Sequence, residues 1–158
     1  MGNTAIPSDR PARDKVPLAS SNPILLYDGV CGLCNRLIQF VLKRDRQDRF
    51  RFASLQSEFA RKILARHGTN PGDLDTFYLL LDYGQLGERL VSRSDAAVGV
   101  LRVLGGLWAG FGSVMRMFPR WFRDWAYTRI ARSRYRIFGK YDACPLPEER
   151  YRERFLDT

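Results

Sequence analysis

The feature that most constrains the fold is a cysteine pair placed between an apolar run and an amphipathic pattern. The run from Ile24 to Tyr27 ends at Asp28-Gly29, which predicts a buried strand followed by a tight turn. Cys31 and Cys34 come directly after this turn. From Val30 to Leu42 the apolar residues recur at steps of three and four, which predicts a helix with one apolar face. The cysteine pair is therefore expected at the start of a helix.

The spacing of the two cysteines suggests different chemical roles. Backbone N–H groups and the helix dipole favour a thiolate at a helix N-terminus, so Cys31 is expected to be the attacking nucleophile. Cys34 falls within the apolar stripe, so we expect it to be the more buried thiol and to resolve the mixed disulfide. Asp28, at the end of the strand, is either a helix cap, a proton acceptor for Cys34 or a plain turn residue.

The rest of the N-terminal two thirds predicts an α/β domain. Strands are expected over 49–53, 76–81 and 88–91, with a helix over 54–67 between the first two. Ser94 and Asp95 are helix-capping residue types, and the apolar residues that follow them have helical spacing. The order β-α-β-α-β-β-α is that of a thioredoxin-like domain, a mixed four-stranded sheet flanked by helices.

An extra helical region follows this domain. Residues 103–115 carry no charge but number only 13, whereas a bilayer-spanning helix needs about 20. Pro119 is well placed to open a final helix over 120–135. We expect the large aromatic side chains of this region to pack in a core, namely Trp108, Phe111, Trp121 and Trp125.

The two ends of the chain differ from the middle. Residues 1–23 hold four prolines and lack the apolar core of a secretory signal, which predicts a flexible tail and a cytoplasmic protein. Residues 24–145 are expected to form one domain and residues 146–158 a charged C-terminal tail. The chain has three cysteines, too few for a secreted domain held together by disulfides.

The net charge of +9 is concentrated near the C-terminus. Eight basic residues stand against Asp124 alone, and they are Arg116, Arg120, Arg123, Arg129, Arg132, Arg134, Arg136 and Lys140. The run indicates either a solvated helix face or a surface for an anionic partner. A non-catalytic redox switch or binding module that docks on a membrane surface or an acidic partner is therefore an alternative. No nucleic-acid recognition motif accompanies the arginines.

A metal site is the other alternative for the cysteines. Cys31, Cys34, Cys144 and His67 provide the ligand types of a Cys₃His zinc site, but no second paired motif is present. We therefore expect neither a metal nor a bound cofactor. His67 is expected at the surface, and Cys144 is either a structural thiol or a third redox cysteine.

Several motifs resemble those of a known family. The segment from Asp28 to Cys34 resembles the Asp-x-x-Cys-x-x-Cys signature of the DCC family of thiol-disulfide oxidoreductases. Over residues 24–145 the resemblance continues through Arg51-Phe52-Ala53, Ser94-Asp95-Ala96, Tyr127-x-x-x-Ala131-x-x-Arg134-Tyr135 and Phe138-Gly139. It implies a thioredoxin-like fold and dithiol-disulfide exchange at Cys31 and Cys34, with Asp28 completing the signature. Its partners would be a protein or small-molecule disulfide or thiol, and a donor such as glutathione or a thioredoxin system.

The chain departs from ordinary thioredoxins at one position. Thioredoxins place a cis-proline before the strand that faces the cysteine pair, whereas the corresponding stretch here, residues 74–77, contains no proline. Capture of a peptide substrate by the backbone is therefore expected to differ.

Overall fold

A computed structural model describes residues 22–74, 76–142 and 147–157. Most of the expected N-terminal tail, and also Cys144, lie outside the described residues. The elements in chain order are β1 (Ile24–Tyr27), α1 (Gly32–Arg44), β2 (Arg51–Ser54), α2 (Glu58–Arg66), β3 (Tyr78–Leu81), β4 (Arg89–Ser92), α3 (Arg93–Leu104), α4 (Gly106–Met117), α5 (Arg120–Phe138) and the 3-10 helix η1 (Glu149–Arg154).

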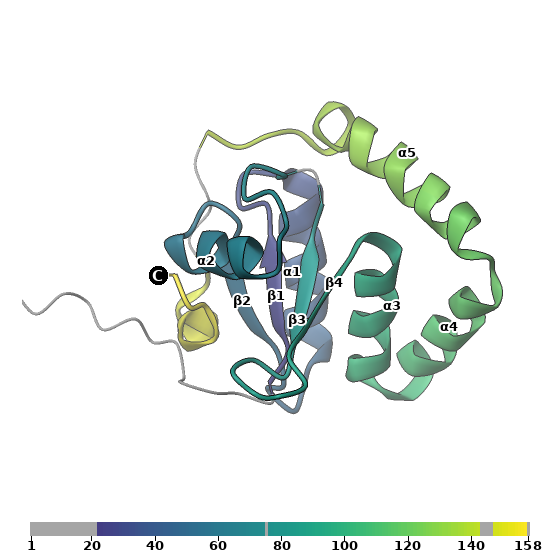
Figure 1. Cartoon of the computed structure of the whole chain (residues 1–158), viewed down its shortest axis with the longest axis horizontal. Helices are drawn as coiled ribbons and strands as arrows, with labels where there is room; N and C mark the ends of the chain where they lie inside the picture. Colours follow the sequence, from purple (N-terminus) through teal and green to yellow (C-terminus); the bar gives the residue numbers. More distant parts are fainter. Residues whose placement is uncertain (1–21, 75, 143–146, 158) are drawn as a thin grey trace, which may run out of the picture.

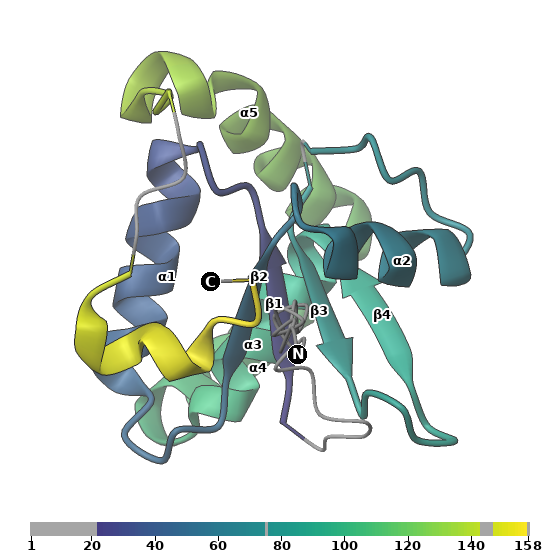
Figure 2. The ribbon, with the colours of Figure 1, turned by 90° about the vertical axis from the view of Figure 1, so that its left-hand side faces the viewer.

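The four strands form one mixed sheet in the order β2-β1-β3-β4 (Figure 1). β1 runs parallel to β2, while β3 is antiparallel to both β1 and β4. Helices α1 and α3 cover one face and α2 covers the other (Figure 2). This is the expected thioredoxin-like arrangement, with extra helices at its C-terminal side.

The central strand β1 is apolar throughout because both of its faces are covered. Leu25 and Tyr27 pack in the core beneath α1 and α3, and Ile24 and Leu26 pack in the core beneath α2. A half-exposed strand would alternate polar and apolar residues instead. The turn that follows β1, directly before the cysteine pair, is thereby held at the centre of the sheet.

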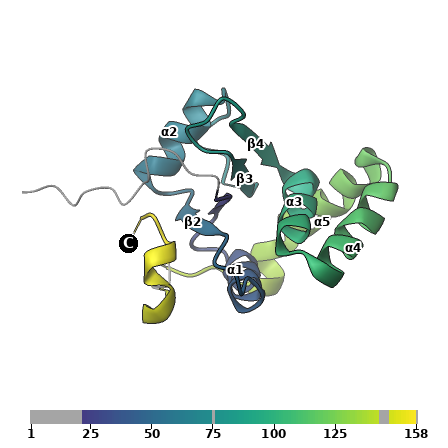
Figure 3. The same cartoon turned by 90° about the horizontal axis from the view of Figure 1, so that it is seen from below.

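The C-terminal helices form a layer beside the sheet. The chain leaves α3 at Gly105 and enters α4 at Gly106, which have φ values of 75° and 54° that suit glycine. α3 lies between the sheet and α4, and α5 returns towards α1 (Figures 1 and 3). In the part of the chain that the structure describes, no helix has the length and apolar character needed to cross a membrane.

The aromatic residues of this layer correct one prediction. Trp108 is half-buried, with its ring centroid 4.9 Å from that of Phe40. Phe111, Trp121 and Trp125 are exposed, so the expectation that they pack in a core is wrong. The reason is that α4 approaches α3 through its Gly112 side, and nothing among the described residues covers its outer side.

The C-terminal residues correct another expectation. Residues 146–158 were expected as a charged tail, but Phe155 and Leu156 are buried beside β2 (Figure 2). The Leu156 N–H donates to the Phe52 carbonyl at 2.9 Å, and the rings of Phe155 and Phe52 stack at 5.2 Å. Arg154 is buried too, because the Asp45 carboxylate pairs with it. The segment therefore covers the outer edge of the sheet.

We predict that Phe155→Ala lowers the free energy of unfolding by about 3–4 kcal/mol, because it removes a buried aromatic ring and leaves a cavity. Urea denaturation measures the change. Arg150→Ala is the matched control in the same segment and, being exposed, is expected to change stability by less than about 0.5 kcal/mol. An unchanged midpoint for Phe155→Ala would mean that the segment does not pack on the sheet in solution.

Candidate active site

The cysteine pair opens helix α1 as expected. Cys31 is the N-cap residue with extended backbone angles, and its Sγ accepts a hydrogen bond from the Cys34 N–H at 3.4 Å. The Cys31 N–H in turn donates to the Asp28 carbonyl at 3.2 Å, which closes the turn after β1. The Cys31 sulfur thus lies at the N-terminus of a helix, the position that reactive cysteines commonly occupy.

The exposure of the two thiols differs from the prediction. Cys31 is fully buried, while Cys34 is 7 % exposed, so the expectation that Cys34 is the more buried of the two is wrong. The apolar stripe of α1 does bury Cys34, as its spacing indicated. Cys31 belongs to the same core cluster, and a distant segment that sequence spacing does not reveal runs beside it.

This segment, Gly139–Tyr141, follows α5 and is called the strap here. It runs antiparallel beside Val30–Gly32, with the Gly32 N–H donating to the Gly139 carbonyl at 3.1 Å and the Tyr141 N–H donating to the Val30 carbonyl at 2.8 Å. A Cβ atom at Gly32 would lie 2.1 Å from the Phe138 carbonyl oxygen, so only glycine permits this approach. The strap thus lies directly beside Cys31, which is itself fully buried.

The electrostatic environment distinguishes the thiols in another way. Burial, followed by the proximity of Cys31, raises the pKa of the Cys34 thiol to about 12, against an opposing effect of the Arg134 charge. Cys34 therefore stays protonated at neutral pH. The capping geometry at Cys31 and the protonated state of Cys34 distinguish the two sulfurs more clearly than exposure does.

Asp28 is buried at the centre of a polar network. Its Oδ1 accepts hydrogen bonds from the Val30 N–H at 3.1 Å and from Gln56 Nε2 at 2.8 Å. Its Oδ2 pairs with Arg134 Nη2 at 3.3 Å and accepts a short hydrogen bond from the Tyr135 hydroxyl. Burial and this contact with the carboxylate raise the pKa of Tyr135 to about 12. Asp28 therefore connects the turn before the cysteines to helix α5.

Arg134 and Tyr135 are site residues that the sequence did not assign to a partner. Both belong to the Tyr127–Tyr135 motif, so the signal was present, but the sequence alone does not show which of the many arginines is buried. A separation of 106 residues between Asp28 and Arg134 leaves the pairing to the tertiary structure.

Ser94 and Asp95 also bind α5 rather than cap a helix. The helix α3 begins at Arg93 with Ser92 as its N-cap, so the expected capping role is wrong. The Ser94 hydroxyl donates a hydrogen bond to the Asp124 carboxylate, and Asp95 pairs with Arg123 at 3.1 Å. These contacts fix the N-terminal half of α5 against α3.

Side chains of α5 form hydrogen bonds with the loop before β3, at the place where thioredoxins have their cis-proline. The Phe77 N–H donates to the Tyr127 hydroxyl at 3.1 Å, and Arg134 Nη2 donates to the Leu74 carbonyl at 2.9 Å. No cis peptide bond occurs within the described ranges. Backbone groups of this loop are thus occupied by side chains of the same chain.

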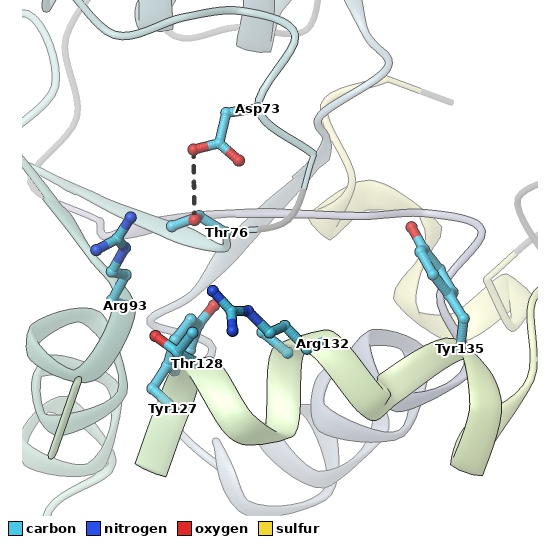
Figure 4. Close-up of a pocket in the computed structure, with 8 residues that line it drawn as sticks. Asp73, Thr76, Arg93, Tyr127, Thr128, Arg132 and Tyr135 are labelled. Atoms are coloured by element: carbon cyan, nitrogen blue, oxygen red, sulfur yellow. Dashed lines mark hydrogen bonds between the residues drawn. The ribbon is translucent and has the colours of Figure 1, made fainter. Parts of the chain in front are cut away.

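A cavity of about 410 Å³ lies between this loop, the start of α3 and α5 (Figure 4). The residues around it are Asp73, Thr76, Arg93, Tyr127, Thr128, Ala131, Arg132 and Tyr135. Tyr135 connects the cavity to Asp28, and the lining carries two positive charges, from Arg93 and Arg132, and one negative charge, from Asp73. Its lining is largely polar.

Of the residues of the zinc alternative, the described part of the chain brings Cys31 and Cys34 together, while His67 is bound elsewhere. His67 Nε2 lies 2.8 Å from the Glu88 carboxylate at the end of α2. Across residues 22–74, 76–142 and 147–157, no three His, Cys, Asp or Glu side chains gather as metal ligands would. Cys144, the third cysteine of that alternative, is not among the residues described.

A dithiol that caps the first helix of this mixed four-stranded sheet defines a thioredoxin-like thiol-disulfide protein. The chain belongs to the DCC1-like thiol-disulfide oxidoreductase family, whose model matches residues 25–140. This membership confirms the resemblance seen in the motifs. It supports a thiol-disulfide oxidoreductase role, with thiols or disulfides as substrates and redox partners.

Two relatives are similar over most of their length. The uncharacterized protein YuxK of Bacillus subtilis is 40 % identical over 135 residues, covering 85 % of this chain and 94 % of YuxK. The chloroplastic DCC family protein At1g52590 of Arabidopsis thaliana is 34 % identical over 124 residues, covering 78 % of this chain and 69 % of that protein. No solved structure matches the chain.

We predict that Asp28→Asn lowers the free energy of unfolding by about 3 kcal/mol, because it leaves the buried Arg134 charge without its carboxylate. Chemical denaturation measures the loss. The double variant Asp28→Asn/Arg134→Met is expected to be more stable than Asp28→Asn alone, since it removes the uncompensated charge. Additive losses in the double variant would contradict the pairing.

Proposed function

We propose that this protein catalyses thiol-disulfide exchange through Cys31 as the attacking thiol and Cys34 as the resolving thiol. The observation that carries the proposal is the cap of α1, in which Cys31 Sγ accepts the Cys34 N–H at 3.4 Å. This N–H donates to the sulfur that we assign as the attacking atom, while Cys34 remains protonated because burial raises its pKa to about 12.

The exchange transfers two electrons from the dithiol to the substrate. The Cys31 thiolate attacks one sulfur of the substrate disulfide, forms a mixed disulfide and releases the other sulfur as a thiolate, which takes up a proton. Cys34 then loses its proton and attacks Cys31 Sγ, which releases the second substrate thiol and leaves a Cys31–Cys34 disulfide. A thiol donor such as glutathione or a thioredoxin system, present in a reducing compartment such as the cytoplasm, restores the dithiol.

The contacts of Asp28 favour a positioning role for this residue. Both of its oxygens are already occupied, by Val30 and Gln56 on one side and by Arg134 and Tyr135 on the other. Transfer of the Cys34 proton to Asp28 would require one of these contacts to be released first. We therefore propose that Asp28 holds the turn, and with it the Cys31 cap, against α5.

The strap and the cavity indicate how a substrate would be handled. Backbone hydrogen bonds hold the strap beside Cys31, and the polar cavity lies on the same side of α5 as Tyr135. A small charged disulfide or thiol, of which glutathione is one example, suits a cavity with two arginines better than an apolar substrate does. Access to the sulfur is the step that we expect to limit the rate.

We predict that a redox titration in glutathione buffers yields a reversible Cys31–Cys34 disulfide, trapped by alkylation and identified by mass spectrometry. In Cys34→Ser a mixed disulfide between Cys31 and glutathione should accumulate, because the resolving thiol is absent. Cys31→Ser should react at least about tenfold more slowly at neutral pH, because Cys34 remains a buried, protonated thiol. The same protein is expected to turn over a small-molecule disulfide.

Two outcomes would count against this function. If no reversible disulfide forms, the dithiol does not exchange at all. If the disulfide forms but no substrate is turned over, the non-catalytic redox switch becomes the better account of the cysteine pair.

We predict that Tyr141→Pro increases the alkylation rate of Cys31, measured in the Cys34→Ser background. Proline removes the N–H that donates to Val30. The loss of one hydrogen bond of about 1 kcal/mol raises the fraction of molecules with a detached strap roughly fivefold, and the alkylation rate should rise with it. Tyr141→Ala keeps the N–H and removes only an exposed side chain, so it is the matched control. Equal rates for the two variants would show that the strap does not limit access.

A further inference from the structure

The outer side of α4 carries an apolar stripe that faces solvent. Leu107, Phe111, Val114 and Phe118 follow one another at steps of four, three and four, and all four are exposed. The opposite side of the helix approaches α3 closely, since a Cβ at Gly112 would lie 3.2 Å from Leu101 Cβ. Large apolar side chains gathered in one exposed patch mark interaction surfaces in soluble domains.

The stripe continues into an aromatic cluster at the start of α5. The ring of Phe122 lies between three neighbours, with centroid distances of 5.7 Å to Phe118, 5.9 Å to Trp121 and 6.0 Å to Trp125. Trp121 is 72 % exposed and Trp125 is 59 % exposed. Their contacts with one another hold the rings in place while their outer surfaces remain open to solvent.

The same face of α5 becomes basic towards its C-terminal half. Arg129, Arg132 and Arg136 follow Trp125 at steps of four, three and four along the helix, and Arg132 also borders the cavity beside Tyr135. All three are exposed. Within the described parts of the chain, neither Arg129 nor Arg136 takes part in an ion pair, in contrast to Arg120 and Arg123, which pair with Asp95.

The acidic residue of α5 lies on another side of this helix. Asp124 accepts the hydrogen bond of Ser94 and so faces α3. The outer face of α4 and α5 therefore combines apolar rings with positive charge and no carboxylate from α5. We call this surface the α4–α5 face.

These are the features of a surface that lies on an anionic bilayer. Tryptophan and other aromatic rings favour the boundary between headgroups and acyl chains, and a helix that lies in this plane keeps its basic residues at the anionic headgroups. Each arginine close to such a surface contributes about 1 kcal/mol of attraction. α4 is the outermost helix of its layer, so its stripe can meet a flat surface without hindrance from the sheet (Figures 1 and 3).

We propose that the α4–α5 face binds the surface of an anionic phospholipid bilayer without crossing it. A two-fold dimer is a poorer explanation, because it would bring the basic half of α5 into the same interface twice with no exposed carboxylate of α5 to neutralise it. The inner side of α5 holds Asp28 through Arg134, so docking would bring the dithiol close to the membrane.

The test uses the full chain and its own tryptophans as reporters. Two of the three tryptophans, Trp121 and Trp125, are exposed on this face, while Trp108 is half-buried against Phe40. A blue shift of the fluorescence therefore reports the entry of the two exposed rings into lipid. Vesicles of phosphatidylcholine alone are compared with vesicles of phosphatidylcholine mixed with phosphatidylglycerol, by sedimentation and by fluorescence. We expect binding and a blue shift with the mixed vesicles and neither with the neutral ones.

Two pairs of variants separate charge at this face from net charge. Arg129→Gln/Arg136→Gln is expected to weaken binding to the mixed vesicles by roughly thirtyfold. Two attractions to headgroups of about 1 kcal/mol each are lost, and every 1.4 kcal/mol is a factor of about ten in affinity. Arg61→Gln/Arg89→Gln removes the same charge from exposed positions on α2 and β4 and should leave binding within about twofold. Trp121→Ser/Trp125→Ser should abolish sedimentation with vesicles while keeping the thermal midpoint, because both rings are exposed.

Several results would overturn the proposal. Equal binding to neutral vesicles, equal loss in both arginine pairs, or no binding to either vesicle would each do so. Concentration-dependent dimers that bury the tryptophans without lipid would assign the face to a second copy of this chain instead. Vesicle binding requires no disulfide exchange, so Cys31→Ser/Cys34→Ser should bind as the unmodified protein does, and the outcome is independent of the proposed catalysis.

Discussion

The structure around the dithiol depends on one buried ion pair, between Asp28 and Arg134. The carboxylate stands at the end of the central strand and the guanidinium on the last long helix, and both are almost fully removed from solvent. Burying a carboxylate is costly unless its oxygens are satisfied, and here Gln56, Tyr135 and a backbone N–H complete the partners of Asp28. The pair therefore fixes α5 beside the turn that carries the cysteines.

Once α5 is held there, the chain that leaves it must pass Cys31. The strap forms backbone hydrogen bonds on both sides of that residue, and Gly32 permits its close approach. The cysteine with the geometry of a nucleophile is consequently the more buried one, and the two thiols are distinguished by their electrostatic surroundings rather than by exposure. A thiol at a helix N-terminus that is covered by the protein's own backbone combines a reactive geometry with restricted access.

Helix α5 has two different faces, and the structure assigns each a different kind of contact. Its inner side supplies Tyr127, Arg134 and Tyr135 to the site, while its outer side carries exposed tryptophans followed by arginines. Aromatic residues are most often buried, which is why the sequence interpretation placed Trp121 and Trp125 in a core. The interpretation failed because α4 and α5 form the outermost layer of the described chain, so one side of each has no neighbour to pack on.

Much of this protein follows from the sequence by itself. The apolar run before the cysteines, the helical spacing after them and the order of helices and strands along the chain were enough to predict a thioredoxin-like sheet with a dithiol at the start of a helix. These features are local properties of the chain. Only the tertiary structure decided four further features: which arginine pairs with Asp28, that Ser94 and Asp95 bind α5, that the strap runs beside Cys31, and that Phe155 covers the sheet edge. Each of these joins segments far apart in the chain, and no local pattern encodes which of many similar side chains will meet.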